Sequence, residues 1–576
     1  MNKKKIIFII SIIVLFLIVI SVILISKNKA KLDYEIEVVN EINYMLYSEN
    51  NKFGVIDKSG NIVVQSQYDE VQIPNPSKPI FICMYNYNEG KNQYTVKVLN
   101  DKSEQILYQY LYVEAIKLNA GISEIPYEKS VLKFMQNGKY GLINFNGDII
   151  VKPKYDEIKS LDYREGLLVV KKDDKYGIIN INGATVVKEK YDFIESDRYY
   201  DSDAEYKKSG FIVGNKIGEE YKYGYLNAQG KKILDNIYDQ IERIENKDDI
   251  YIVAFKDEKA GLYKGKNNVI KHEYEDIQYD KNNNCLIIQQ DSKQGISDLN
   301  GNILFELKYD NIYISGKYIN AQNATDVEIF DFNTKQKIEL DNIIGLNQTD
   351  NDKYLVAITN DDKYKIYNTE NNQIMKNEYD YLEYIYDDYF IVMNNKKYGI
   401  IDINEEKLID IKFDYIQKIE NTKLIQAIDN SKKTTNIYIQ DKLIASMNNG
   451  VVCIKDDHIV LQSNSDIKYI SYDGKLVNST DLFEKNIYVF CKNNKWGFED
   501  KDHKVIVNAE YDLVTELNKY GFAGIKKDGK WGVINSEGNI ILEPTYEIDS
   551  NNPNFIGKFY EYDLGYGEPY FISDNK

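Results

Sequence analysis

Apolar and polar residues alternate over short stretches of this chain, with a period typical of β-strands. In one stretch the apolar run 167–170 precedes Gly177-Ile-Ile-Asn-Ile, and a second apolar run follows at 185–187. Successive strand residues point to opposite faces of a sheet, so such alternation places one face against a core. No segment after residue 25 keeps a 3.6-residue apolar period for three turns. The pattern therefore predicts an all-β fold.

Pairs ending in glycine separate the predicted strands. Such pairs supply the positive φ angles that a tight hairpin requires. Three strands are clear in each stretch, and a short fourth strand fits around the Tyr-Asp-x-Ile sequence that follows, as at 191–194. The turn pairs begin at Ser59, Asn146, Asn182, Gln229, Asn300 and Asp473.

An internal repeat organises these strands. Residues 139–150, 175–183 and 530–541 resemble one another and begin with Lys-Tyr-Gly or Lys-Trp-Gly. An aromatic residue follows each glycine after fourteen residues, or after thirteen in one unit, and an acid usually comes next. The repeat positions are Gly54, Gly141, Gly177, Gly224, Gly261, Gly295, Gly399, Gly497 and Gly532, with Tyr68, Tyr155, Tyr191, Tyr238, Tyr274, Tyr309, Tyr379, Phe413, Tyr511 and Tyr546.

The spacing of these positions predicts about fourteen units. Lys365 takes the glycine position ahead of Tyr379, and several gaps between glycines are about twice the normal length. Filling those gaps gives a mean spacing of about 37 residues between positions 54 and 532. The weaker matches that fill them are Thr95, Glu328, Asn436 and Lys468.

Two stretches carry a resemblance to a known family. Asn-Lys-Trp-Gly-Phe at 494–498 and Gly-Lys-Trp-Gly-Val at 529–533, each with Tyr-Asp or Tyr-Glu fourteen residues after the glycine, resemble the bacterial WG-repeat family. The resemblance covers nearly the whole chain after residue 45, although most units carry Tyr or Phe in place of Trp and five lack the glycine. It implies all-β repeats, often secreted or membrane-attached, with no shared enzymatic activity and no functional residues to carry over.

The residue types explain the repeat physically. A glycine after a strand aromatic fits a place where another backbone or ring packs too close for a Cβ atom. The aromatic residue fourteen positions later fits the stack between neighbouring units, and the acid after it fits a turn or a cap on backbone N–H groups. A repeated ligand site for sugars or Ca²⁺ is the rival interpretation. The Asn-x-Asn-Gly sequences lack the further acids of a calcium loop, which favours hairpin turns.

The sequence is compatible with two arrangements of the units, which are closed propellers and an open β-solenoid. Fourteen units invite two seven-bladed rings, with a first block of repeats at 36–314 and a second at 315–548. Units of about 37 residues are slightly short for four-stranded blades, which run to about 40–45 residues in familiar propeller repeats. A Tyr- and Gly-rich tail follows at 549–576.

One apolar segment predicts a transmembrane helix at residues 6–25, after a basic cytoplasmic tip at 1–5 and before a linker at 26–35. Twenty residues in a helix span about 30 Å, the thickness of one hydrocarbon core. A cleaved signal peptide is the competing interpretation, but the apolar stretch is long and no good cleavage site follows. A short basic N-terminus stays in the cytoplasm, which would place the repeats outside it.

Charge and composition exclude some functions. The formal net charge of −18 repels phosphate backbones and argues against nucleic acid as a partner. Abundant Ile, Asn, Lys and Tyr suggest an A+T-rich bacterial genome. Four cysteines, at 83, 285, 453 and 491, lie in apolar runs without metal-binding spacing, and a disulfide between Cys453 and Cys491 stays open. No nucleophile elbow, phosphate loop or His-Glu-x-x-His sequence occurs, so we expect no enzyme, cofactor or metal.

The departures from the repeat hold the candidate binding residues. Segments 72–93 and 196–221 look like inserted loops, and the second contains Tyr199 and Tyr200. Tyr384 and Tyr386 belong to an acidic aromatic cluster that could bind a partner. The sequence thus predicts a membrane-anchored extracytoplasmic binding or scaffolding protein that recognises a protein or a cell-envelope polymer. The alternative is a glycan-acting enzyme on a propeller scaffold, which would use a pair of carboxylates.

Overall fold

The computed structural model describes most of the chain after residue 32. The predicted cytoplasmic tip 1–5, the membrane helix 6–25 and most of the linker 26–35 lie outside the described residues. No helix among the described residues is long and apolar enough to cross a membrane. The described residues are 33–49, 52–90, 93–118, 125–162, 164–197, 210–244, 249–324, 326–371, 373–454, 458–463, 466–478, 487–517, 520–546, 559–561 and 569–571.

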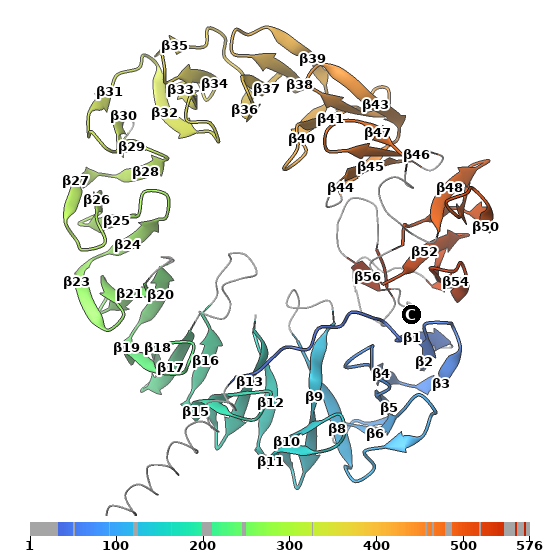
Figure 1. Ribbon diagram of the computed structural model, residues 1–576. Helices are drawn as coiled ribbons and strands as arrows, with labels where there is room; N and C mark the ends of the chain where they lie inside the picture. The colour runs from blue at the N-terminus through green and yellow to red at the C-terminus, as the bar shows by residue number, and fades with distance from the viewer. Residues whose placement is uncertain are drawn as a thin grey trace, which may run out of the picture. The chain divides into compact units, whose positions relative to one another are not determined.

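Fourteen antiparallel sheets follow one another along the chain, as predicted (Figure 1). We number them sheets 1–14 in chain order. Each strand pairs with the next one in sequence, which is the topology of a β-propeller blade. Twelve sheets have four strands and sheets 1 and 13 have three; a two-stranded hairpin near the C-terminus, β55 (Phe559–Glu561) with β56 (Pro569–Phe571), completes the described strands.

Two compact units divide the described chain, one before Glu242 and one from Glu242 onward. The division falls within β20. The first unit contains β1 (Tyr44–Glu49), β2 (Lys52–Asp57), β3 (Ile62–Tyr68); β4 (Glu70–Gln72), β5 (Phe81–Asn88), β6 (Gln93–Leu99), β7 (Gln105–Ile106); β8 (Tyr112–Lys117), β9 (Tyr127–Gln136), β10 (Lys139–Asn144), β11 (Ile149–Tyr155); β12 (Glu157–Leu161), β13 (Arg164–Lys172), β14 (Lys175–Asn180), β15 (Thr185–Tyr191); β16 (Phe193–Ser196), β17 (Phe211–Ile217), β18 (Glu220–Leu226) and β19 (Lys232–Tyr238), which form sheets 1–5.

The second unit holds sheets 6–14. Its strands are β20 (Gln240–Ile244), β21 (Tyr251–Lys256), β22 (Lys259–Lys264), β23 (Asn267–Tyr274); β24 (Asp276–Asp280), β25 (Cys285–Gln290), β26 (Lys293–Ser297), β27 (Ile303–Tyr309); β28 (Asn311–Ser315), β29 (Tyr318–Asn323), β30 (Asp326–Asp331), β31 (Lys337–Ile338); β32 (Ile343–Gln348), β33 (Tyr354–Thr359), β34 (Tyr364–Asn368), β35 (Gln373–Ile374); β36 (Tyr381–Tyr386), β37 (Tyr389–Asn394), β38 (Lys397–Asp402), β39 (Lys407–Phe413); β40 (Tyr415–Lys418), β41 (Leu424–Asp429), β42 (Thr434–Ile439), β43 (Lys442–Asn448); β44 (Val451–Ile454), β45 (His458–Gln462), β46 (Ile467–Ser471), β47 (Leu476–Val477); β48 (Tyr488–Lys492), β49 (Lys495–Glu499), β50 (Val505–Tyr511); β51 (Leu513–Val514), β52 (Phe522–Lys527), β53 (Lys530–Asn535) and β54 (Ile540–Tyr546).

The predicted repeat positions fall in one place in every sheet. All nine glycines, Lys365 and the four weaker matches lie on the next-to-last strand of their sheet, from β2 to β53. The prediction of fourteen all-β units is therefore confirmed. The grouping into blocks 36–314 and 315–548 stays a prediction. Its boundary would lie within β28, the first strand of sheet 8.

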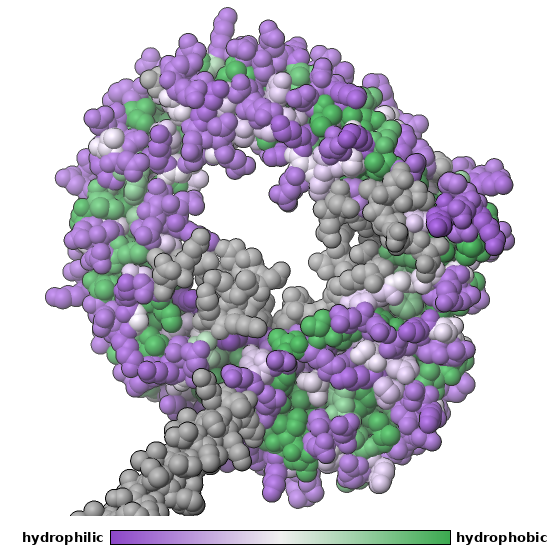
Figure 2. Space-filling view, viewed as in Figure 1, coloured by the Kyte–Doolittle hydropathy of each residue, from purple (hydrophilic) through white to green (hydrophobic). Residues whose placement is uncertain are grey.

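The core of each unit lies between neighbouring sheets. Leu142 and Val151 of sheet 3 pack with Leu168 and Ile179 of sheet 4, and all four side chains are buried. Alternating burial along the strands produces this arrangement, since one face of each sheet meets the next sheet. Hydrophilic residues cover most of the surface seen in Figure 2, and hydrophobic residues show only in separate areas.

An N-terminal strap, residues 33–43, crosses several sheets of the first unit. Its first carbonyl, that of Asp33, accepts a hydrogen bond of 2.7 Å from Asn182 Nδ2 in sheet 4. Farther along, the carboxylate of Glu37 accepts from Lys78 Nζ at 2.7 Å and from Asn75 Nδ2 at 3.0 Å, between β4 and β5. The strap therefore holds sheets 2 and 4 together with hydrogen bonds that no repeat motif supplies.

Candidate binding surface

The repeat glycines lie beneath a backbone carbonyl of the last strand. A Cβ atom added to Gly177 would lie 2.7 Å from the Val187 carbonyl oxygen, and one added to Gly141 would lie 2.5 Å from that of Val151. Across all nine glycines the corresponding distance is 2.4–2.9 Å. The last strand bulges at this point, because the register shifts on both sides of the residue after the glycine, Leu142 in sheet 3 and Ile178 in sheet 4, and the glycine itself has no partner in the ladder. Only glycine accommodates such a close approach without displacing the strand.

The strand pairing explains the fourteen-residue interval. In sheet 4, Tyr191 pairs directly with Tyr176, the residue before Gly177. The same pairing joins Tyr155 to Tyr140 in sheet 3. The repeat aromatics from Tyr68 to Tyr511 are at most 8% exposed, so their rings belong to the packing between sheets. Of the Tyr546 side chain nothing is described.

At eight described positions the acid after the aromatic joins two sheets. Asp192 Oδ1 lies 2.5 Å from Lys175 Nζ of sheet 4, and its Oδ2 accepts the N–H of Lys216 at 3.0 Å in sheet 5. Its own N–H donates to the Gly214 carbonyl at 3.0 Å. We call this contact the Lys–Asp bridge. The equivalent ion pairs are Lys52–Asp69, Lys139–Asp156, Lys222–Asp239, Lys293–Asp310, Lys363–Asp380, Lys397–Asp414 and Lys495–Asp512, with a looser Lys259–Glu275 pair at 3.8 Å.

The Lys–Asp bridge changes the titration of its carboxylates. The Lys175 ammonium, followed by the Lys216 N–H, holds the pKa of Asp192 below its ordinary value. The corresponding lysine and turn N–H lower the pKa of five other bridging aspartates in the same way. These are Asp156, Asp310, Asp380, Asp414 and Asp512.

The Asn-Gly sequences form hairpin turns. In sheet 3 the Asn144 side chain accepts the N–H groups of Asn146 and Asp148 at 3.0 and 2.9 Å, and the Gly147 N–H donates to the Asn144 carbonyl at 3.0 Å. Asp298 makes the equivalent contacts in sheet 7. The side-chain oxygens of these turns thus bind backbone N–H groups. No group of metal-ligating residues occurs in the described part of the chain.

The structure contradicts the expectation that Tyr384 and Tyr386 are exposed binding residues. Tyr386 is 8% exposed and packs in the core between sheets 10 and 11, with Phe413. Tyr384 is half-buried against Phe390, at a ring distance of 5.8 Å. Strand alternation alone does not show which face of β36 meets its neighbours. Tyr199 and Tyr200 lie outside the described residues.

The first inserted segment also differs from its prediction. Segment 72–93 contains the strand β5, so only residues 73–80 form a loop. Residues 73–76 are buried, and the Asn75 side chain contacts the strap. Pro74 and Pro76 therefore lie in a packed connection of the first unit.

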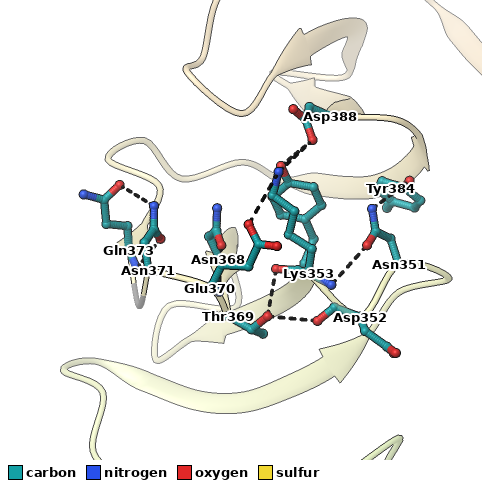
Figure 3. Close-up of polar contacts among 11 residues, drawn as sticks. Asn351, Asp352, Lys353, Asn368, Thr369, Glu370, Asn371, Gln373, Tyr384 and Asp388 are labelled. Carbon is teal, nitrogen blue, oxygen red and sulfur yellow. Dashed lines mark hydrogen bonds and ion pairs between the residues drawn. The ribbon is translucent and has the colours of Figure 1, made fainter.

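A polar cluster surrounds Lys353 at the loop between β32 and β33 (Figure 3). Lys353 Nζ lies 3.3 Å from Asp388 Oδ1 of sheet 10 and 3.9 Å from Glu370 Oε2 of sheet 9. The Tyr354 hydroxyl donates to the same Asp388 oxygen at 2.5 Å. Contacts with Tyr354 and then Lys353 lower the pKa of Asp388. This cluster therefore stays charged at neutral pH.

Neighbouring sheets hold the acidic turn 387–388 from both sides. Asp387 Oδ2 lies 2.9 Å from Lys423 Nζ of sheet 11, while Asp388 pairs with Lys353 of sheet 9. Half or more of the side-chain surface of Asp387, Asp388 and Lys423 is exposed. We call residues 349–353, 387–388 and 419–423 the first-hairpin loops of sheets 9–11. They present charged groups that differ from one sheet to the next.

All four cysteines are free thiols, so the disulfide that the sequence allowed between Cys453 and Cys491 is absent. Burial raises the pKa of Cys83 and of Cys285 to about 12. Cysteines of this kind behave as small core residues and not as nucleophiles.

Sequence reasoning missed the lysine of the bridge. A lysine stands two positions before the repeat glycine at residues 52, 139, 175 and 222, for example, and seventeen before the acid. The constant spacing was a usable signal, because opposite charges at a fixed interval in many units indicate a recurring ion pair.

These features define a repeat protein built of fourteen β-propeller blades. Residues 53–75, 140–176, 496–531 and 531–547 match the sequence model of the WG containing repeat, and these matches support assignment of the blades to the WG-repeat family. No curated protein matches the chain.

Two solved structures are similar at low level. One, titled as a eukaryotic initiation factor, has 12% identity and a TM-score of 0.25, covering 59% of this chain and 96% of its own. The other is the extracellular domain of a hybrid two component system from B. thetaiotaomicron, with 12% identity, a TM-score of 0.19, and coverage of 93% and 81%. These TM-scores are too low to support any argument about this chain.

Proposed function

We propose that this chain is a non-enzymatic binding or scaffolding protein, anchored in a membrane by residues 6–25 and displaying its sheets outside the cytoplasm. Its partner would be a protein or a cell-envelope polymer. One observation supports this proposal above the others: the repeated residues are all engaged in packing and bridging the sheets. The side chains that differ between sheets are thus the ones left for recognition.

The first-hairpin loops supply a recognition surface of suitable chemistry. In these loops Lys353, Asp387, Asp388 and Lys423 place two positive and two negative charges on sheets 9–11. Charged groups at a surface add specificity and association rate when a partner carries the complementary pattern.

A capture experiment tests the binding role. The intact chain, immobilised through a C-terminal tag, would be incubated with extracts of cell envelope from its own source. We expect retention of a specific protein or polymer by the parent chain and its loss in a Lys353→Ala/Lys423→Ala variant. The matched control is Lys397→Ala, a bridging lysine of sheet 10, which should retain the ligand. Equal capture by all three chains would contradict recognition by these loops.

The anchored orientation has its own test. In intact cells whose outer layers have been removed, external protease should digest the repeats but leave residues 1–25 with the membrane. A chain that resists protease until the membrane is opened would contradict the exported orientation.

A further inference from the structure

A cavity of about 270 Å³ lies among sheets 2, 3 and 4 of the first unit. Its walls come from β4, β8, β9 and β12. The repeat is interrupted here, because Leu111 stands before β8 where Asp69 stands before β4, and Leu111 is 93% exposed. The pairing of β8 with β9 also shifts between Ala115 and Lys117. Such bulges are over-represented beside functional sites.

One wall of the cavity is held by fixed polar groups. Gln72 is 7% exposed; its Oε1 accepts the Ala115 N–H at 3.0 Å, and its Nε2 donates to Glu70 Oε1 at 2.9 Å. Glu114 lies 3.0 Å from Lys133 Nζ, so these two charges neutralise each other. Glu70 forms no ion pair with any residue that the structure describes. Its carboxylate therefore keeps acceptor capacity for a ligand.

Two lysines leave positive charge at the same cavity. Lys117 forms no ion pair with a described residue, and the nearest carboxylate to Lys159 Nζ is that of Glu157 at 3.9 Å. Tyr127 pairs with Lys117 across the β8–β9 ladder. Burial, followed by the charges of Glu70 and Glu114, raises the pKa of Tyr127. Its phenol thus stays protonated and can donate a hydrogen bond.

We propose that this cavity binds a small hydroxylated carboxylate of the sugar-acid class, an inference that rests on the proposed binding role. The carboxylate would lie against Lys117 and Lys159, which give charge-assisted hydrogen bonds. Ligand hydroxyls would donate to Glu70, and ring carbons would contact Ile116 and Ile158. A neutral sugar lacks the charged contact. A phosphate dianion carries more negative charge than a carboxylate, so the carboxylates of Glu70 and Glu114 would repel it more strongly.

Calorimetric titration of the purified intact chain with D-glucuronate tests the site. We expect saturable binding that weakens at least about tenfold in the Lys117→Ala/Lys159→Ala variant, because each lost hydrogen bond to a charged group is costly. Glu70→Gln should also weaken binding. The matched control is Lys188→Ala, an exposed lysine of sheet 4 away from the cavity, which should bind like the parent. Melting curves of all variants would show that each remains folded.

Comparison ligands decide the chemistry and the source. D-glucose and D-glucose 6-phosphate should bind at least about tenfold more weakly than D-glucuronate. A uronate-containing oligosaccharide that binds more tightly would assign the site to a polymer, and equal binding would assign it to the free acid. Absence of saturable glucuronate binding in the millimolar range, equal binding of glucose, or insensitivity to the lysine changes would overturn the proposal. If the chain captures an envelope ligand but does not bind glucuronate, the sugar-acid site is wrong and the proposed binding role stands.

Discussion

Sheets with and without the repeat glycine differ in their last strand. In sheet 4, which contains Gly177, the last strand β15 has seven residues; in sheet 8, where Glu328 replaces the glycine, β31 has two. Sheets 2, 9 and 12 also lack the glycine, and their last strands β7, β35 and β47 each have two residues. Every sheet with the glycine has a last strand of seven or eight residues. Long last strands thus accompany the glycine, whereas in sheet 9, which lacks it, pairing beyond the two-residue strand is limited to the single Tyr364–Tyr379 bridge.

We attribute this difference in strand length to the group that occupies the space above the next-to-last strand. In sheet 4 the Val187 carbonyl occupies the place of a Cβ atom on Gly177. In sheet 8 the Glu328 carboxylate occupies that region and binds the Tyr309 hydroxyl at 2.9 Å and Lys337 Nζ at 3.1 Å. In sheet 8 the ladder with the last strand ends after two residue pairs.

Sheet 11 departs from this rule and shows its limit. Asn436 replaces the glycine, yet β43 has seven residues. The Asn436 side chain instead bonds to its neighbours, donating to the Ala427 carbonyl at 3.2 Å and accepting from Ser446 Oγ at 2.7 Å. A single register shift replaces the two shifts of the glycine sheets. The Asn436 side chain, which forms hydrogen bonds to the two neighbouring strands, is therefore compatible with a last strand that pairs over seven residues with a single register shift.

The largest expected effect comes from a repeat aromatic. Tyr191→Ala should cost about 3–5 kcal/mol of unfolding free energy, because it empties a buried site between sheets 4 and 5. Tyr313→Ala in sheet 8 removes a side chain that is 55% exposed and should change stability by no more than about 0.5 kcal/mol. Denaturant titration followed by circular dichroism measures both. Similar losses in the two variants would show that the repeat aromatics do not form the core.

A valine at the repeat position should act differently in the two kinds of sheet. Gly177→Val forces a side chain against the Val187 carbonyl and should cost about 1–3 kcal/mol, as overpacking does. Lys365→Val in sheet 9 meets no such carbonyl and loses only an ion pair with Glu378, worth less than about 1 kcal/mol. The same titration compares them. A larger loss for Lys365→Val would reverse the explanation of the short strands.

Acid should weaken the sheets that carry the Lys–Asp bridge more than the others. Six bridging aspartates have lowered pKa values when folded. The stability they provide is therefore present above the ordinary Asp pKa of about 3.9 and is lost as pH falls through the lowered values. Stability should therefore fall below about pH 4. Amide exchange at decreasing pH should show this first where sheets 4 and 10 meet the next sheet. The junctions after sheets 2 and 8, which lack a Tyr-Asp pair, should change less.

A single Lys–Asp bridge should have the smallest effect. Lys175→Met removes one bridging lysine and should cost about 0.2–1 kcal/mol, because both partners are partly exposed. High salt should reduce that difference, since it screens exposed charges. Lys188→Met, which alters an exposed lysine of the same sheet, is the control for loss of charge. A cost equal to that of Gly177→Val would mean that the bridge contributes more than its exposure allows.

The sequence predicted what local signals carry. Period-two alternation, glycine-ended turns and a regular spacing were sufficient for the strands and for fourteen units, including weak ones such as Thr95 and Lys468. The short last strands were not predicted, because their length depends on which group occupies the space above another strand. The burial of Tyr386 and the contact of the strap with Asn75 depend on neighbouring sheets. The alternation of residues within one strand contains no information about such contacts.

Amide hydrogen exchange of the last strands tests the central claim, that the glycine allows the strand to continue past its bulge. Within residues 187–191 of sheet 4, Val187 and Tyr191 should be protected, because they pair with Ile178 and Tyr176 on the two sides of the bulge. Residues 339–342 of sheet 8 follow the end of β31 and should exchange as open chain does. Equal protection of the two segments in the parent protein would contradict the account.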